Sequence, residues 1–329
     1  MSAQQQFNVQ NGTKTAFYGD LETAIQQAVS GDTIYLPGQV VHVQNDLVIN
    51  KKLALIGAGC DVDSIGGLQT TEIKKNDGNG NYYYDATINF RNGSDGSLLT
   101  GCIVGPIQFG NTDEFGVAQQ NISNVTIWRN MINLSSINLG VTPTNNQIKQ
   151  ITISENNIGN GLDGLGASNC TINNNLCVFS IQNFNNSRIF NNVTRSTVLS
   201  LSECTVENNF INSGFGSGSN SIFNNNAFSG NATFPNGNNT GSNNLINQET
   251  IRTFVVNDLS LPKNLAIRSD SPCKNAGADG TDIGIFGGNA PYKAGAVPFN
   301  PHINSAFISP QTDKAGNLKV NVQVSAQTR

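Results

Sequence analysis

The sequence predicts an all-β chain folded as a right-handed parallel β-helix, a solenoid with an N-terminal capping helix and a C-terminal extended tail. The main observation is a five-residue unit, close to Thr-Ile-x-x-Asn, that occurs six times between residues 126 and 226. Apolar and polar residues alternate within each unit, and no amphipathic helix separates the copies, so we expect one strand per coil. Successive copies are 26, 19, 17, 17 and 16 residues apart, counted between their aliphatic residues Ile127, Ile153, Ile172, Ile189, Val206 and Ile222.

Coils that stack at about 4.8 Å align equivalent residues in columns along the solenoid axis. The aliphatic residue of each unit, and the positions two before and five after it, are mostly apolar or small and are expected to face inward. Every unit carries Asn three residues after the aliphatic residue, where its amide can bond its own turn and the next coil. The position two before holds Val125, Ile151, Cys170, Ser187, Cys204 and Asn220; the position five after holds Ile132, Ile158, Cys177, Thr194, Ile211 and Ala227; the Asn column holds Asn130, Asn156, Asn175, Asn192, Asn209 and Asn225.

The elements before the repeats predict a cap and the first coils. Residues 20–29 have the pattern of a short amphipathic helix with Asp20 as its N-cap, and this helix would cover the open end of the first coil. Covering that end matters because an exposed sheet edge promotes aggregation. Strands are expected at residues 33–36, 47–49 and 53–56 and around Ile73, Ile88 and Ile103.

Two segments carry a resemblance to a known superfamily. LETAIQQAVSGDTIYLPG at residues 21–38, followed by LALIGAG at 53–59, resembles the opening of the pectin-lyase-like right-handed β-helices. LAIRSDSPCKNAGADGTDIGIFGG at 265–288 resembles the closing coil of uncharacterised secreted bacterial β-helix repeat proteins. With the repeats, the resemblance covers about residues 15 to 290. It implies a fold but no single function, because lyases, hydrolases and adhesins share it.

Residues 1–300 are therefore predicted to form the β-helix with its caps, and residues 301–329 a C-terminal tail or docking strand. The segment from Leu318 to Val324 alternates apolar and polar residues, as a strand does. We expect the tail to run back along the outside of the solenoid as an extra strand, or to pair with another molecule.

Composition limits the partners and the location. Only 12% of the residues are charged and the net charge is −4, which argues against nucleic acid as a ligand because such binding needs a basic surface. No apolar run has transmembrane length, and residues 1–4 lack the features of a signal peptide. The chain is then either cytosolic or a mature form, and the resemblance favours a secreted or cell-surface mature form. The sequence does not indicate the oligomeric state.

The six cysteines show no metal-ligand spacing, so no structural metal is expected. Cys170 and Cys204 share an inward column but lie two coils apart, about 9 to 10 Å, which exceeds the span of a disulfide. We interpret them as small core residues. One disulfide among the six remains an open alternative.

The chain has few charged residues that could act in catalysis, since only 12% of its residues are charged. Asn111-Thr112-Asp113 resembles the first catalytic motif of polygalacturonases, but the Gly-His-Gly and Arg-Ile-Lys motifs of that family do not follow, and the histidines are His42 and His302. Asp113 and Glu114 are therefore interpreted as turn residues, with a calcium site between them and loop carbonyls as an alternative. No other cofactor is expected.

Arg129 and Glu155 occupy the same register on adjacent coils, so an ion pair is the expected arrangement rather than an acid and base couple. If exposed, such a pair would contribute only about 0 to 1 kcal/mol. Asp163 lies in a Gly-rich turn, where its carboxylate would satisfy backbone amides.

Binding is better supported than catalysis. The position after the aliphatic residue faces outward and carries Trp128, Phe190 and Phe223 on a surface rich in amides. Exposed aromatic rings beside amides are suited to stacking on sugars or to contacting a protein. The alternative is that loops or the tail cover these rings.

Taken together, these features predict a non-catalytic extracellular or cell-surface module, for binding or as a scaffold, whose partner is a surface glycan or a cell-envelope protein. Two alternatives stay open. The first is a polysaccharide lyase or glycoside hydrolase with an atypical site built from Asp113, Glu114, Glu155 and Arg129. The second is a subunit of a larger surface or secretion assembly, which the tail would join.

Overall fold

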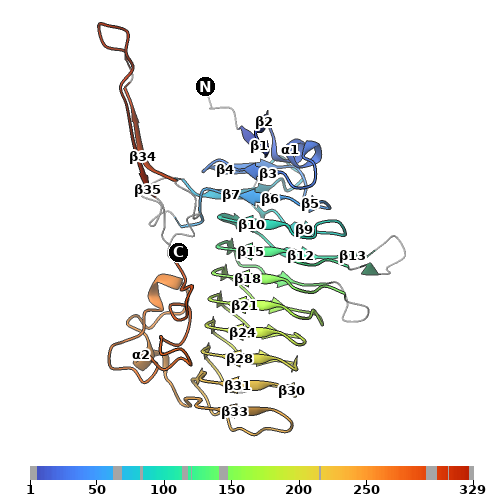
Figure 1. Cartoon of the computed structure of the whole chain (residues 1–329), viewed down its shortest axis with the longest axis vertical. Helices are drawn as coiled ribbons and strands as arrows, with labels where there is room; N and C mark the ends of the chain where they lie inside the picture. The colour runs from blue at the N-terminus through green and yellow to red at the C-terminus, as the bar shows by residue number, and fades with distance from the viewer. Residues whose placement is uncertain are drawn as a thin grey trace.

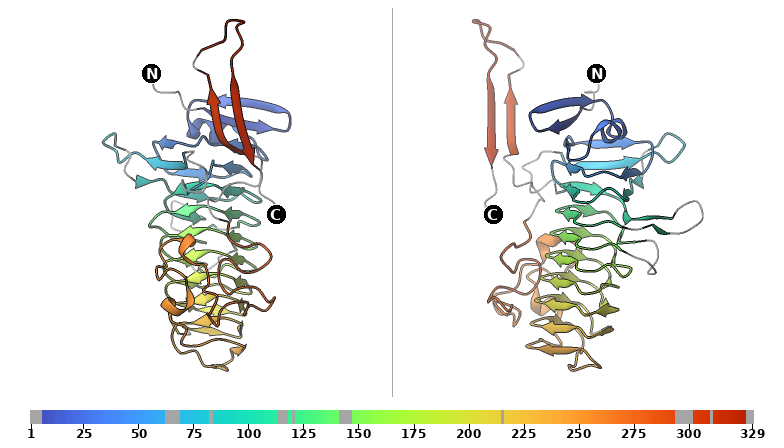
Figure 2. Two further views of the ribbon diagram at one scale, coloured as in Figure 1. Left: turned by 90° about the vertical axis from the view of Figure 1, so that its left-hand side faces the viewer. Right: turned by 45° about the vertical axis from the view of Figure 1, so that its right-hand side comes forward.

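The computed structural model shows a parallel β-helix whose coils stack along one long axis (Figure 1). Each regular coil adds one strand to each of three parallel sheets, here called sheets A, B and C. The N-terminal cap lies at one end of the stack and the last coil at the other (Figures 1 and 2). The structure describes residues 6–61, 69–81, 84–112, 118–119, 121–140, 147–214, 216–293, 302–309 and 311–325.

Sheet A is the longest and has twelve strands. Its neighbours are parallel from β3 onward, whereas β1 is antiparallel to both β2 and β3. In stacking order the strands are β2 (Lys14–Tyr18), β1 (Phe7–Asn11), β3 (Thr33–Tyr35), β6 (Ala54–Ile56), β10 (Leu98–Thr100), β15 (Thr126–Trp128), β18 (Thr152–Ser154), β21 (Thr171–Asn173), β24 (Arg188–Phe190), β28 (Thr205–Glu207), β31 (Ile222–Asn224) and β33 (Thr240–Ser242).

Sheets B and C complete the coils. Sheet B contains β4 (Val40–Val43), β7 (Thr71–Lys75), β11 (Cys102–Val104), β16 (Met131–Ile132), β19 (Asn157–Ile158), β22 (Leu176–Cys177), β25 (Val193–Thr194), β29 (Phe210–Ile211) and β32 (Ala227–Phe228), with β8 (Tyr84–Asp85) paired to β7. Sheet C contains β5 (Leu47–Ile49), β9 (Ile88–Phe90), β12 (Ile107–Phe109), β17 (Ile137–Asn138), β20 (Leu162–Asp163), β23 (Ile181–Gln182) and β26 (Val198–Leu199). Three small sheets pair β13 (Asn111–Thr112) with β14 (Ala118–Gln119), β27 (Leu201–Ser202) with β30 (Gly218–Ser219), and β34 (His302–Ile308) with β35 (Val320–Ser325).

A single residue with positive φ turns each repeat coil from sheet A to sheet B. Asn174, between β21 and β22, has φ 54°. This left-handed conformation is uncommon for residues other than Gly, and Asn adopts it more readily than most. We call the stacked set of these residues the corner column, and it comprises Arg129, Glu155, Asn174, Asn191, Asn208 and Asn225.

The Asn that follows each corner residue points inward and forms a continuous ladder. The backbone N–H of Asn175 donates to Oδ1 of Asn192 at 3.0 Å, and that of Asn192 donates to Oδ1 of Asn209 at 2.9 Å. The Asn192 side-chain amide also donates to the carbonyl of Ile172 in the preceding coil at 2.9 Å. The predicted role of this column is confirmed. Its members are Asn130, Asn156, Asn175, Asn192, Asn209, Asn226 and Asn244.

The predicted register is confirmed for the first five copies and wrong by one residue for the last. Val206 pairs with Phe223, so the final spacing is 17 residues and not 16. Phe223 is fully buried, whereas Ile222 is 45% exposed. Phe223 fills the interior of the coil that contains β31, although the other copies have an aliphatic residue at this position. Accordingly Ser221, Asn226 and Phe228 occupy the columns that had been assigned to Asn220, Asn225 and Ala227.

The predicted capping helix is present as α1 (Leu21–Gln27). The Asp20 carboxylate accepts a hydrogen bond from the Thr23 N–H at 2.7 Å, as expected of an N-cap. At the other end of α1, the Lys51 ammonium donates to the carbonyls of Ile25, Gln26 and Ala28 at 3.2, 3.1 and 2.9 Å. A cation is favourable there because the helix dipole leaves these carbonyls partly negative. The hairpin of β1 and β2, which the sequence analysis did not anticipate, completes the cap.

In the last coil, which contains β33, Gly241 leaves room for the Phe234 ring, and this ring stacks on that of Phe223 with centroids 5.0 Å apart. The chain then turns back, and residues 248–293 lie along the outside of the stack as a segment that we call the strap (Figures 1 and 2). The strap contains α2 (Thr250–Thr253) and the 3₁₀ helix η2 (Pro262–Asn264). Residues 265–288, which resemble a closing coil, belong to the strap.

The tail forms a hairpin of its own, in which β34 pairs with β35, and it projects beside the N-terminal end of the stack (Figure 1). The expected extra strand on the solenoid is therefore wrong for the described residues, and pairing with another molecule stays a prediction. The predicted boundary at residues 300 and 301 lies outside the described residues.

All six cysteines are buried and free, as expected of core residues. Burial raises the pKa of the Cys102 thiol to about 12 and that of Cys170 to about 11. These thiols are therefore protonated at neutral pH and poor nucleophiles.

Asn192→Ala is expected to lower the free energy of unfolding by about 3 kcal/mol, because each buried group that loses its partner costs about 1–3 kcal/mol. The Asn192 side chain accepts a hydrogen bond from the N–H of Asn175 and donates to the carbonyls of Ile172 and Phe190. Urea denaturation followed by circular dichroism measures the change. Asn238→Ala, in an exposed turn, is the control. Equal stability of the two variants would contradict a structural role for the ladder.

Candidate functional site

The strap is held by the corner column. The Asn225 amide donates to the Ala276 carbonyl at 3.1 Å, and the Ala278 N–H donates to Asn208 at 2.8 Å. One coil farther, the Asn191 amide donates to the Gly284 carbonyl at 3.4 Å. From Ala276 to Gly284 the strap advances along the sequence, while the coils that it bonds come successively earlier in the chain. The strap therefore runs opposite to the direction in which the coils are stacked.

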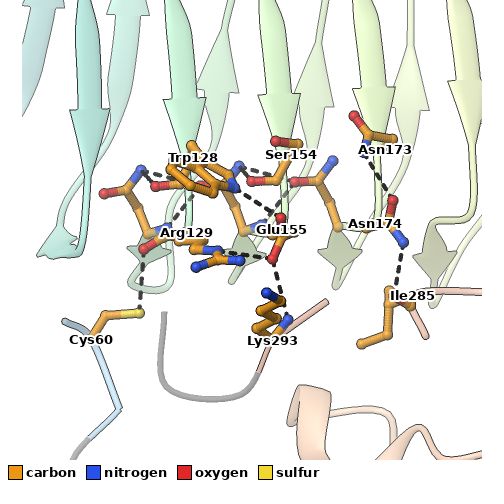
Figure 3. A network of polar contacts seen from close by, with 12 residues as sticks. Cys60, Trp128, Arg129, Ser154, Glu155, Asn173, Asn174, Ile285 and Lys293 are labelled. Atoms are coloured by element: carbon orange, nitrogen blue, oxygen red, sulfur yellow. Dashed lines mark hydrogen bonds and ion pairs between the residues drawn. The ribbon is translucent and has the colours of Figure 1, made fainter. Parts of the chain in front are cut away.

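The same pattern continues toward the N-terminal end (Figure 3). The Asn174 amide donates to the carbonyls of Ile285 and Gly287 at 2.9 and 3.0 Å. The Lys293 N–H donates to the Glu155 carboxylate at 3.2 Å. Each corner residue from Glu155 to Asn225 thus bonds the strap through its side chain.

An apolar strip lies beneath the strap. The outward residues of four sheet B strands are fully buried there, against apolar residues of the strap. The rings of Phe210 and Phe254 meet edge to face with centroids 4.7 Å apart. Burial of such side chains contributes about 1.5–3 kcal/mol each. The four sheet B residues are Leu176, Val193, Phe210 and Ala227.

Arg129 and Glu155 form the predicted ion pair, with Nε and Oε2 2.9 Å apart. The pair is buried rather than exposed, since the two residues are 0% and 4% accessible. Trp128 donates from Nε1 to Oε1 of Glu155 at 2.9 Å, and the Arg129 guanidinium lies 4.4 Å from the Trp128 ring centroid. Tyr292 of the strap is also buried nearby, and burial raises the pKa of its hydroxyl well above the ordinary value. Two of the candidate catalytic residues therefore meet in a site closed to solvent.

The other candidates have different positions. Asp113 and Glu114, and with them the calcium alternative, lie outside the described residues. Asp163 accepts hydrogen bonds from the Leu165 N–H at 2.9 Å and from the side chains of Gln182 and Asn183 at 2.7 and 2.8 Å. Its predicted role in a turn is confirmed.

The three candidate binding aromatics are separated by the structure. The outward placement of Phe223 is wrong, because the register error described above puts its ring in the core. Trp128 is half-buried and bonded to Glu155. Phe190 alone of the three lines a groove on the surface.

That groove, which we call the strap groove, has a volume of about 500 Å³ and lies between the outward face of sheet A and the edge of the strap. The Arg188 guanidinium lies over the Phe190 ring, 5.0 Å from its centroid. Backbone pairing aligns Asn173, Phe190 and Glu207 on three adjacent coils. Its lining includes Asn173, Arg188, Phe190 and Glu207 of the solenoid and Asp279 and Asn289 of the strap.

Five of these six residues were not predicted as site residues from the sequence; Phe190 was. The alternation in Arg188-Ile189-Phe190 placed two of them on one face, which was a usable signal. Asp279 and Asn289 gave no such signal, because nothing in their local sequence indicates that the strap returns to coils about 70 to 115 residues earlier.

Comparison with known proteins adds no assignment: no protein-family model matches the chain, and no curated protein matches it. Among the described residues, no helix is both long and apolar enough to cross a membrane. The same part of the chain contains no cluster of three or more His, Cys, Asp and Glu side chains placed to hold a metal ion.

Glu155→Gln is expected to lower the free energy of unfolding by about 3–5 kcal/mol, because it removes the charged carboxylate that pairs with the buried Arg129 guanidinium. The strap should also become sensitive to limited proteolysis, since Glu155 receives the Lys293 N–H. Glu203→Gln, at an exposed corner, is the control. Unchanged stability and an intact strap would show that the ion pair does not fasten it.

Proposed function

We propose that this protein is a non-catalytic binding module of the pectin-lyase-like type, secreted or displayed at the cell surface, and that a glycan occupies the strap groove. The observation that carries the proposal is Phe190, an aromatic ring in a groove whose other walls carry amides and charges. Aromatic rings stack on the apolar faces of sugars, and neighbouring polar groups fix the orientation of the ligand. The volume of about 500 Å³ lies in the range of ligand pockets.

One of the two carboxyl groups in the groove, that of Asp279, is unsuited to act as the acid of a glycosidase. A glycosidase needs a carboxylic acid that keeps its proton near neutral pH, usually through a raised pKa. The hydrogen bond from the Thr281 hydroxyl lowers the pKa of the Asp279 carboxyl, so this group is ionised there. Arg129 and Glu155 are buried beneath the strap and remain outside the groove. A lyase or hydrolase with its site at Asp113 and Glu114 is the rival outcome of the tests.

A second candidate function, membership of a larger surface or secretion assembly, is favoured by the tail hairpin. Phe307, Val320 and Val322 are 56%, 51% and 47% exposed on it. A two-stranded hairpin is marginally stable in water on its own, and its unpaired edges can take another strand. The hairpin is therefore suited to docking on a partner protein.

Phe190→Ala is expected to weaken binding to isolated cell envelopes about tenfold, because an aromatic contact contributes about 1–1.5 kcal/mol. Phe179→Ala removes a ring that is 54% exposed outside the groove and is the matched control. Binding is measured by sedimentation of labelled protein with the envelopes, before and after periodate oxidation of their glycans. Periodate-resistant binding that still depends on Phe190 would identify a protein ligand. Degradation of the glycan by the wild type would favour the enzyme alternative.

Deletion of residues 301–329 is expected to abolish capture of a stoichiometric envelope protein in a crosslinking pull-down, while the solenoid keeps its thermal stability. Val322→Lys tests the same edge without shortening the chain. Retention of the same partner by both variants would contradict the assembly function.

A further inference from the structure

The strap groove carries an unbalanced set of charges. Its solenoid side holds Arg188 and Glu207, and its strap side holds Asp279. One cation faces two carboxylates, so the net charge of the described lining is −1. The whole chain has the same sign, with a net charge of −4.

Each charge has a defined position. The Arg188 guanidinium lies over the Phe190 ring, 5.0 Å from its centroid, so the cation is placed beside the aromatic side chain. The Asp279 carboxylate accepts hydrogen bonds from the Thr281 N–H and hydroxyl at 3.1 and 2.7 Å. These bonds keep Asp279 anionic at neutral pH. An anionic ligand would therefore meet a fixed negative charge on the wall of the strap.

The groove also has a defined length. Asn173, Phe190 and Glu207 stand at equivalent positions on β21, β24 and β28. Two steps between coils span about 10 Å at the spacing of neighbouring strands. This is the length of two linked sugar rings. Phe190 is at the middle coil, with an amide of Asn173 on one side and the carboxylate of Glu207 on the other.

From these observations we propose that the ligand of the strap groove is a neutral glycan, recognised over about two sugar units, and not a polyuronate. The inference rests on the proposed glycan-binding function and specifies its ligand class. Phe190 provides the stacking surface, while Asn173, Glu207 and Asn289 offer partners to sugar hydroxyls from the two walls. Carboxylates are suited to this role because a hydroxyl can donate to them in a charge-assisted hydrogen bond. The carboxylate of a uronate cannot donate in this way and would be repelled by the carboxylates of the groove.

The test is calorimetric titration of the full chain with hexamers and dimers of β-1,4-linked glucose, mannose and xylose and with the hexamer of galacturonate. We expect at least one neutral hexamer to bind, and the dimer of the same sugar to have an affinity within about threefold of it. The affinity for hexagalacturonate should be at least about tenfold lower than that for the neutral hexamer. Phe190→Ala should lower affinity for the neutral hexamer about tenfold, whereas Phe179→Ala should not.

Charge removal tests the reason for the preference. Glu207→Gln and Asp279→Asn keep the shape of each side chain, and Asn can still accept the Thr281 bonds. In the double variant, the ratio of the affinity for the neutral hexamer to that for the acidic hexamer should fall about tenfold. If the double variant loses its circular dichroism spectrum, Glu207→Gln alone gives the same comparison with about half the effect on free energy.

The outcomes separate the two levels of the proposal. Tighter binding of hexagalacturonate that Phe190→Ala abolishes would overturn the neutral preference while leaving glycan binding in the groove. Neutral binding that Phe190→Ala leaves intact would overturn both. Absence of binding to every sugar, with Phe190-dependent capture of a protein, would overturn the glycan ligand and retain the binding module.

Discussion

The corner between sheets A and B is the constraint on which the rest of the molecule depends. Every repeat coil turns there from sheet A to sheet B through one residue with positive φ. This residue is Asn in four of the six coils of the corner column. Because the corner residue points outward and the next residue points inward, one Asn-Asn pair serves two surfaces. The inward Asn joins the coils through the ladder, and the outward Asn presents an amide column to the strap.

The strap groove follows from that arrangement. Sheet A leaves its outward residues on one side of the corner, and the strap, fixed to the corner column, forms the other wall. Neither part makes a groove alone, since a flat sheet face offers no enclosure and the strap has no fixed path without the amides. The position of Phe190 in a groove is thus a consequence of how the coil turns at Asn191, the next residue in the chain.

The sequence predicted what is periodic and local. The solenoid, the ladder and helix α1 depend on residue types at short, repeated spacing, and a stretch of one coil contains the whole signal. The predicted register of the last repeat copy was wrong because Ile222 and Phe223 are both apolar, and only packing inside the solenoid decides which of them turns inward. The strap could not be predicted as a wall of the groove, because its contacts join residues far apart in sequence and its turns contain no periodicity.

The coil whose corner residue is Glu155 explains why the strap has one register along the corner column. An Asn amide can donate to any strap carbonyl, so a uniform amide column would permit the strap to shift by a coil. Glu155 differs because it only accepts, and it receives the Lys293 N–H while its charge is balanced by Arg129. A strap shifted by one coil would place a carbonyl oxygen against that carboxylate, and two acceptors cannot bond each other. The buried ion pair therefore adds little to net stability compared with apolar packing, but it fixes the strap in one register, and with it the width and the charge of the groove.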